Sequence, residues 1–304
     1  MSDFVAYTEL YGSETKTLLT DENSVVWCSG DRLSIFQGAN IADTYEVSES
    51  SVGKSEGSFS LVSDNSGEVN GDFTSGVEIS ANIAVYPFDD DLDCSSVNVS
   101  EDQEGVLSYT ISNVSIPSTQ SYTENSFASG SFPMVAVTSS MGDHTLKFKN
   151  LLGAIELNLR GTCIVKSIAI SGNKGEILAG EAEVVAYVGD AKPEITMLQE
   201  GSESVILDCG DGVGLNQAEA TRFIIAIPPT DFVTGFTVTI TDDEENEMVL
   251  ENMAPNQVLR SSILKMPKLT IPLTKPDDII VFEDALVEEM CLAAFDTNED
   301  DELS

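Results

Sequence analysis

The sequence predicts an all-β protein of two β-sandwich domains in series, followed by a short C-terminal helix. Apolar and polar residues alternate with a period of two in many short segments, as they do in half-buried strands. Gly, Asn, Asp and Pro separate these segments, and no helical period occurs before residue 278. Many short strands with turn residues between them are typical of β-sandwiches.

The clearest strand is expected at residues 235–241, where Phe236, Val238 and Ile240 face one side and three threonines face the other. Residues 154–159 alternate in the same way. Proline closes the more buried strands, because it removes a donor from the ladder. Further strands are expected at 4–8, 24–27, 33–36, 59–62, 83–86, 106–111, 134–138, 164–170, 184–188, 205–207 and 222–227, and at 146–149, where Leu146 and Phe148 alternate with Lys147 and Lys149.

The density of strands predicts two domains, 1–140 and 141–275, which meet near residues 139–142. The charge divides along the same line. Residues 1–140 hold 22 acidic and 3 basic residues, and residues 141–275 hold 19 and 11. The segment 276–304 holds 11 acidic residues and no basic one. We expect this last segment to be a helical tail, the start of a further domain.

The charge bears on the choice of partners. The chain of 304 residues carries 52 acidic and 14 basic residues, a net charge of −38. Such a surface repels nucleic-acid phosphates and anionic lipid headgroups, so neither is expected as a partner. No apolar run reaches the roughly 20 residues that span a bilayer, so direct membrane insertion is not expected either. The first residues show no basic or apolar part of a signal peptide.

The side chains give little support to catalysis. His144 is the only histidine, so any Ser-His-Asp or Cys-His system would have to use it. Residues 210–214 are glycine-rich but lack the Lys-Ser/Thr of a phosphate loop, which favours a hairpin or loop. The acidic clusters at 89–93 and 242–245 are expected to be solvated turns. The five cysteines have no CxxC spacing, which favours buried free thiols over a zinc or redox site (Cys28, Cys94, Cys163, Cys209 and Cys291).

One metal hypothesis follows from spacing. Phe282, Leu286 and Met290 recur at helical intervals, and the predicted helix leads into an acidic segment. There Asp296, Asn298, Asp300 and Glu302 occupy positions 1, 3, 5 and 7 of an EF-hand-like loop. Asp301 stands where glycine normally makes the turn, and Ser304 precedes the bidentate position 12. We therefore expect an incomplete calcium site, completed only in a longer chain with an acidic residue three positions beyond Ser304.

The chain contains an ordered series of short motif segments spread over residues 4 to about 272. They are Thr15–Thr17, Val26–Trp27, Gly30–Phe36, Ala84–Phe88, Pro133–Ala136, Phe148–Gly153, Ser167–Gly172, Leu178–Gly180, Ile227–Pro229, Gly235–Val238 and Arg260–Met266. Read in this order, they resemble the Mfa-like fimbrillin family. The tail after residue 276, with its helix and acidic loop, resembles the EF-hand-like lead-in of BspA-like leucine-rich-repeat surface proteins.

The fimbrillin resemblance implies two transthyretin-like Greek-key sandwiches, exported to the outer membrane surface as fimbrial (pilus) subunits or tip adhesins. It also implies a lipid-anchored precursor and assembly by exchange of a partner's strand into an open sheet edge. The chain departs from this pattern because it lacks the lipoprotein signal and its cysteine. Its earliest arginine, Arg32, lies within a motif segment, which counts against arginine-specific maturation before the core strands.

The expected function is a non-catalytic cell-surface adhesin or fimbrial subunit, without a cofactor in this chain. Its expected partners are other fimbrial subunits or a ligand on a host or bacterial surface. The alternative is a carbohydrate- or host-protein-binding module of a larger surface-anchored protein, which an exposed aromatic platform would favour. Trp27, the single tryptophan, lies in an alternating segment and is expected in the core. An enzyme is the third reading, against which the lone His144 counts.

Overall fold

A computed structural model describes residues 3–9, 25–37, 42–63, 79–89, 91–92, 97–101, 107–128 and 130–271, with residues 97–101 described by their backbone alone. The all-β prediction is confirmed. Within these ranges the only helical element is one 3₁₀ turn, Glu49–Ser51. The helix expected in 276–304 lies outside the described residues. No helix in the described part is long and apolar enough to cross a membrane.

The strands form two layered sandwiches, each around its own apolar core. One layer of the first sandwich is an eight-stranded sheet with the order β11-β1-β4-β3-β2-β5-β10-β12. Its strands are β1 (Phe4–Tyr7), β2 (Arg32–Phe36), β3 (Asp43–Val47), β4 (Glu56–Ser63), β5 (Ile83–Tyr86), β10 (Met134–Val137), β11 (Thr145–Lys147) and β12 (Lys149–Asn150).

Both edges of this sheet come from one segment of chain. Strands β11 and β12 are separated only by Phe148, yet β11 pairs with β1 and β12 pairs with β10. The pairing of β1 with β11 is parallel, and the Phe148 N–H donates to the Tyr7 carbonyl at 2.8 Å. The segment 145–150 therefore bridges the two edges, which leaves little open backbone there.

The second layer of the first sandwich has the order β16-β15-β7-β6. Trp27, which is 1% exposed, fills the space between the layers with its ring edge-on to Phe59 and Tyr86, at centroid distances of 4.9 and 5.5 Å. The prediction that Trp27 is a core residue is thus confirmed. The strands of this layer are β6 (Val97–Glu101), β7 (Leu107–Ile116), β15 (Gly180–Tyr187) and β16 (Glu194–Met197).

The second sandwich packs a sheet with the order β18-β13-β23 against one with the order β21-β20-β14-β17-β8-β9. The strand expected at 235–241 is β20, and Phe236, Val238 and Ile240 all point into the core. Its strands are β8 (Thr119–Thr123), β9 (Ser126–Phe127), β13 (Gly153–Arg160), β14 (Ile164–Gly172), β17 (Ser204–Gly214), β18 (Thr221–Ile227), β20 (Phe236–Asp242), β21 (Glu247–Asn252), β23 (Ile263–Lys265) and β24 (Leu269–Thr270), and beside them β19 (Thr230–Phe232) pairs with β22 (Asn256–Val258).

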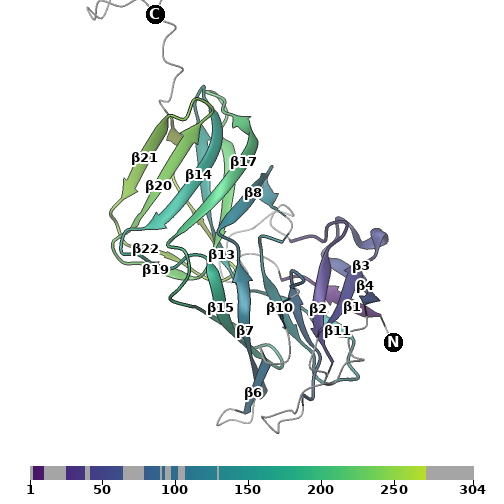
Figure 1. Ribbon diagram of the computed structural model, residues 1–304. Helices are drawn as coiled ribbons and strands as arrows, with labels where there is room; N and C mark the ends of the chain where they lie inside the picture. Colours follow the sequence, from purple (N-terminus) through teal and green to yellow (C-terminus); the bar gives the residue numbers. More distant parts are fainter. Residues whose placement is uncertain are drawn as a thin grey trace, which may run out of the picture.

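Strands cross between the two sandwiches, as Figure 1 shows where β7 and β15 run below β14 and β17. Strand β8 follows β7 along the chain but pairs in parallel with β17 of the second sandwich. Conversely, β15 and β16 lie between β14 and β17 in sequence, yet β15 pairs with β7 of the first. Each sandwich therefore contains strands from both halves of the sequence. The predicted division at residue 140 stays a prediction.

Two local expectations are wrong. Residues 210–214 belong to β17 rather than to a loop, and Gly210 and Gly212 have φ values of +58° and +106°. The glycines adopt positive φ inside the strand, where the pairing with β14 shifts register between Val165 and Ser167. Residues 25–28 form no strand, because the backbone of Trp27 bonds to the turn at Gly53 and Lys54 instead of to a ladder.

Candidate functional site

The calcium ligands predicted from the sequence, Asp296, Asn298, Asp300 and Glu302, lie outside the described residues. The calcium half-site therefore stays a prediction. In the part of the chain that the structure describes, no group of three or more His, Cys, Asp or Glu side chains is arranged to hold a metal ion.

Three other groups of residues that the sequence singled out can be placed in the structure: His144, the acidic cluster at 242–245 and the cysteines. The His144 ring packs against Phe4 with a centroid distance of 4.8 Å. Asp242 is 3% exposed, and its carboxylate accepts hydrogen bonds from the backbone N–H groups of Glu244 and Asn246, as expected of a turn. Of the three cysteines in the described ranges, Cys163 and Cys209 are buried free thiols as predicted, whereas Cys28 is exposed.

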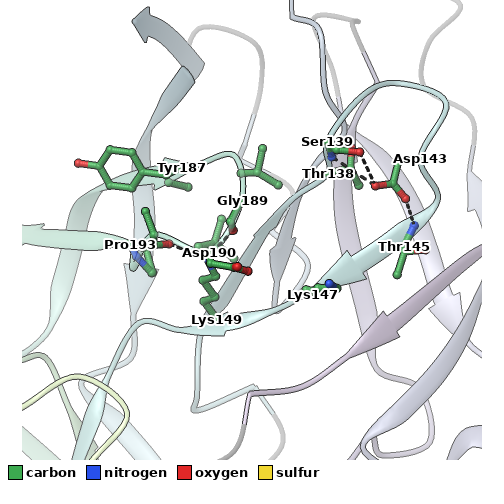
Figure 2. A pocket seen from close by; sticks show the side chains of 14 residues that line it. Thr138, Ser139, Asp143, Thr145, Lys147, Lys149, Tyr187, Gly189, Asp190 and Pro193 are labelled. Atoms are coloured by element: carbon green, nitrogen blue, oxygen red, sulfur yellow. Dashed lines mark hydrogen bonds between the residues drawn. The ribbon is translucent and has the colours of Figure 1, made fainter. Parts of the chain in front are cut away.

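A groove lies where the segment 135–149 meets the connection between β15 and β16 (Figure 2). It consists of two hollows, of about 130 and about 390 Å³, which share Lys147, Lys149 and Asp190 as lining residues. We call the two hollows together the Lys149 groove. Val135 and Ala186, each 2% exposed, supply apolar surface to the smaller hollow.

Strand alternation positions the lysines. Leu146 and Phe148 are 0% and 2% exposed and point into the first core. Thr145, Lys147 and Lys149 therefore point to the opposite side and line the smaller hollow. The sequence thus predicted this alternation, but without the position of 188–193 it could not show that the outward face borders a groove.

Lys149 holds one wall of the groove in place. Its ammonium group donates to the carbonyl oxygens of Gly189 at 2.7 Å and Ala191 at 2.5 Å, and Figure 2 shows the side chain reaching that loop. Burial lowers the pKa of Lys149, while the nearby Asp190 carboxylate acts in the opposite direction. One of the three ammonium protons is not used by these two bonds and is available to a ligand.

Asp143 fixes the opposite wall. Its carboxylate accepts hydrogen bonds from the Ser139 hydroxyl at 2.8 Å and from the Thr145 N–H at 3.0 Å. The hydrogen bond from Ser139 is the main cause that lowers the pKa of Asp143, so the group is ionised at neutral pH. The turn 139–145 is therefore ordered before any ligand binds, which reduces the entropy cost of binding.

A partly buried ion pair closes the far side of the larger hollow. Arg260 donates to both carboxylate oxygens of Glu9, at 2.6 and 3.0 Å, and to the Asn150 carbonyl at 2.7 Å. The Asn150 N–H donates to Glu9 at 2.8 Å. We call these three residues the Glu9 clamp. It joins the end of β1 to β12 and to the loop before β23, and within it the charges of Glu9 and Arg260 are paired with each other.

Two charged side chains of the groove have no hydrogen-bond partner among the described residues. Lys147 is exposed and makes no hydrogen bond or ion pair with any residue that the structure describes. The Asp190 carboxylate, also exposed, accepts no hydrogen bond from the described residues. Apart from Glu9, which is paired with Arg260, the groove with Lys149 and Asp143 carries two positive and two negative groups, which is unusual for a chain with a net charge of −38.

Among proteins of known structure, the chain is similar to a Bacteroides ovatus protein provisionally named a cell adhesion protein, at 12% identity, covering 89% of this chain and 91% of the other, with a TM-score of 0.48. A Bacteroides uniformis protein with the same provisional name matches at 13% identity, 89% and 94% coverage and a TM-score of 0.43. The tip fimbrial protein Mfa3 from Porphyromonas gingivalis matches at 8% identity, 85% and 92% coverage and a TM-score of 0.33.

No family model and no curated protein matches the chain.

Proposed function

We propose that this chain is a non-catalytic cell-surface adhesin, acting as a fimbrial subunit or tip component outside the outer membrane. It would bind other subunits or a surface ligand through strand edges and loop surfaces. The observation that carries the proposal is the exchange of strands between the two sandwiches, because a surface fibre or adhesin has to withstand pulling. The resemblance of the segments quoted above points to the same role.

The ends of the described chain also suit a protein under tension. Strand β1 pairs in parallel with β11, and β23 and β24 both pair in parallel with β13. A force along such a terminal strand loads its hydrogen bonds together rather than one after another. Because β1 belongs to the first sandwich and β24 to the second, tension between them passes through the segments that join the two, and these include the crossing strands β8 and β15.

The alternative, a binding module within a larger surface-anchored protein, is favoured by one observation. The Lys149 groove is ordered by its own hydrogen bonds and presents free charged groups, as a ligand site would. Both roles place the chain at the cell surface without chemistry, and they differ in whether partners are subunits or ligands.

The test uses the purified full chain attached to beads. Under flow, coated beads should be retained on host epithelial or bacterial cells several-fold longer than beads coated with albumin, another acidic protein. In a parallel arm the chain is mixed at high concentration and inspected by electron microscopy for fibres. Retention without fibres supports the binding module, and fibres support the subunit. Neither retention nor fibres would contradict the proposed function.

A further inference from the structure

The Lys149 groove has the features of a ligand site of a definite chemical class. We propose that it binds a sugar residue bearing a single carboxylate, such as the acidic end of a surface glycan. This inference deepens the proposed function by naming the ligand class, and it rests on that function only for its biological setting.

The walls of the Lys149 groove are preorganised. The loop 188–193 is fixed by the two hydrogen bonds of Lys149, and the turn 139–145 is fixed by the Asp143 carboxylate (Figure 2). Both walls are thus held without a ligand. A weak, multi-hydroxyl ligand such as a sugar gains most from a site that does not have to be ordered on binding.

Two charged side chains of the groove can form hydrogen bonds with a ligand. Lys147 and Asp190 line both hollows and make no hydrogen bond with described residues. An ammonium group is a donor for a carboxylate, and an ionised carboxylate accepts hydrogen bonds from hydroxyl groups. Together with the remaining proton of Lys149, these groups match a molecule that carries one carboxylate next to several hydroxyls.

The larger hollow also has an exposed aromatic side chain in its lining. Tyr7 is 40% exposed and lies opposite Lys147 in the parallel register of β1 and β11. It lines the larger hollow, where its ring offers an apolar face for the C–H side of a sugar ring. This is the exposed aromatic residue that the sequence did not identify, because Tyr7 lies in a predicted strand rather than in a loop.

The charge of the groove and of the surface around it selects against polyanions. Two lysines and two aspartates nearly cancel within the groove, while the whole chain carries −38. At physiological salt the Debye length is about 8 Å, so a small ligand in the groove senses mainly these four groups. A polyanion would extend beyond them onto the acidic surface and be repelled, which favours one carboxylate over an acidic peptide or a sulfated polymer.

The test measures binding of glucuronic acid, N-acetylneuraminic acid, glucose and a tetraglutamate peptide to the full chain by ligand-observed NMR titration. At least one acidic sugar should bind more tightly than glucose and the peptide. Lys147→Gln should weaken that binding about threefold to tenfold, the value of one lost charge-assisted contact. Lys174→Gln, which changes an exposed lysine of the second sandwich, is the matched control and should bind like the native chain.

Several results would overturn the inference: no binding of either acidic sugar, equal binding of glucose, tighter binding of the peptide, or Lys147→Gln affinity equal to that of Lys174→Gln. Failure of this inference can be told apart from failure of the proposed function. Native beads that adhere while no acidic sugar binds would sink the sugar site alone. Beads that do not adhere, together with sugar binding lost in Lys147→Gln, would leave the site standing without the proposed role.

Discussion

At the scale of single residues, a few polar contacts hold together segments that are far apart in the chain. The Glu9 clamp joins residues 251 positions apart and is largely shielded from water, with Arg260 and Glu9 side chains 12% and 21% exposed. The pair Arg32–Glu46 has similar chemistry but lies at the surface, with side chains 49% and 36% exposed. Burial should therefore decide which of the two pairs matters for stability.

The first prediction compares these two pairs. Glu9→Gln leaves the Arg260 guanidinium without its counter-charge, and should lower the free energy of unfolding by about 1–3 kcal/mol. Glu46→Gln should cost less than about 1 kcal/mol, because water solvates the freed arginine. Urea denaturation of the two variants measures the difference. Equal losses would show that the clamp contributes no more than a surface ion pair.

The second prediction concerns pH. The folded pKa of Asp143 lies below its ordinary value near 3.8, so its contribution to stability is complete above that value and is lost as pH falls through the folded pKa. Asp143→Asn should thus cost about 0.5–1 kcal/mol at pH 6, a modest value because the turn is solvated. That cost should decrease as the pH falls below 3.8.

The control for this prediction is Asp231→Asn, since the exposed Asp231 side chain makes no hydrogen bond with the residues that the structure describes. Its effect on the free energy of unfolding should be small and independent of pH. A cost of Asp143→Asn that stays constant from pH 6 to pH 3 would contradict the proposed role of the carboxylate.

At the scale of strands, one side chain joins the sheets of the second sandwich. Gln120 on β8 is 2% exposed. Its amide donates to the Ala226 carbonyl at 2.7 Å and accepts from the Ala226 N–H at 3.0 Å. The side chain thus bonds to the outer edge of β18 as a neighbouring strand would, and satisfies two buried backbone groups.

The third prediction is that Gln120→Leu destabilises the chain by about 2–4 kcal/mol, because both backbone groups of Ala226 lose their partners in a buried place. Ser121→Ala, an exposed position on the same strand, should change stability by less than about 0.5 kcal/mol. Thermal or urea unfolding of both variants measures this. A neutral Gln120→Leu would mean that β18 does not depend on the amide.

Strand-level features also show what the sequence could predict. Alternation identified β20 and the inward and outward faces of β11–β12, because the period of two is written in the residues themselves. It did not predict β8 and could not assign β15 to a sheet, since alternation gives the face of a strand but not its partner. The glycines at 210–214 predicted a hairpin or loop, and this prediction is wrong because glycines with positive φ occur both in turns and in bulged strands.

The site was less predictable than the fold. Lys147 and Lys149 were visible as outward residues, but the groove exists only because the connection at 188–193 comes from a distant part of the sequence. The spacing of Asp296, Asn298 and Asp300 predicted a calcium half-site, which lies outside the described residues. Local sequence patterns thus predicted many of the strands, whereas the groove depends on contacts between segments about 40 residues apart.

At the scale of the whole molecule, the exchanged strands couple the two cores. The first core contains Ala182, Val184 and Ala186 from β15, while β8 extends a sheet of the second. Removing either sandwich would remove strands that belong to a sheet of the other, and would expose the apolar residues that those strands cover. The two halves predicted at 1–140 and 141–275 are therefore expected to unfold together.

The fourth prediction uses two natural probes of this coupling. Trp27 fluorescence reports on the first core, and alkylation of the buried Cys209 thiol, mapped by mass spectrometry, reports on the second. Burial raises the pKa of Cys209 to about 12, so the thiol should not react at pH 8 until the core opens. Both probes should give the same urea midpoint and slope. Separate midpoints would show that the cores unfold independently.

Coupling of the cores under force is the property that the proposed role needs, and single-molecule pulling of the full chain from its two ends tests it most directly. We expect one rupture that releases residues 3–271 together, a length on the order of 900 Å at about 3.4 Å per residue, less the native end-to-end distance. Two separate ruptures, each releasing about half of that length, would contradict the account of two cores held as one unit by exchanged strands.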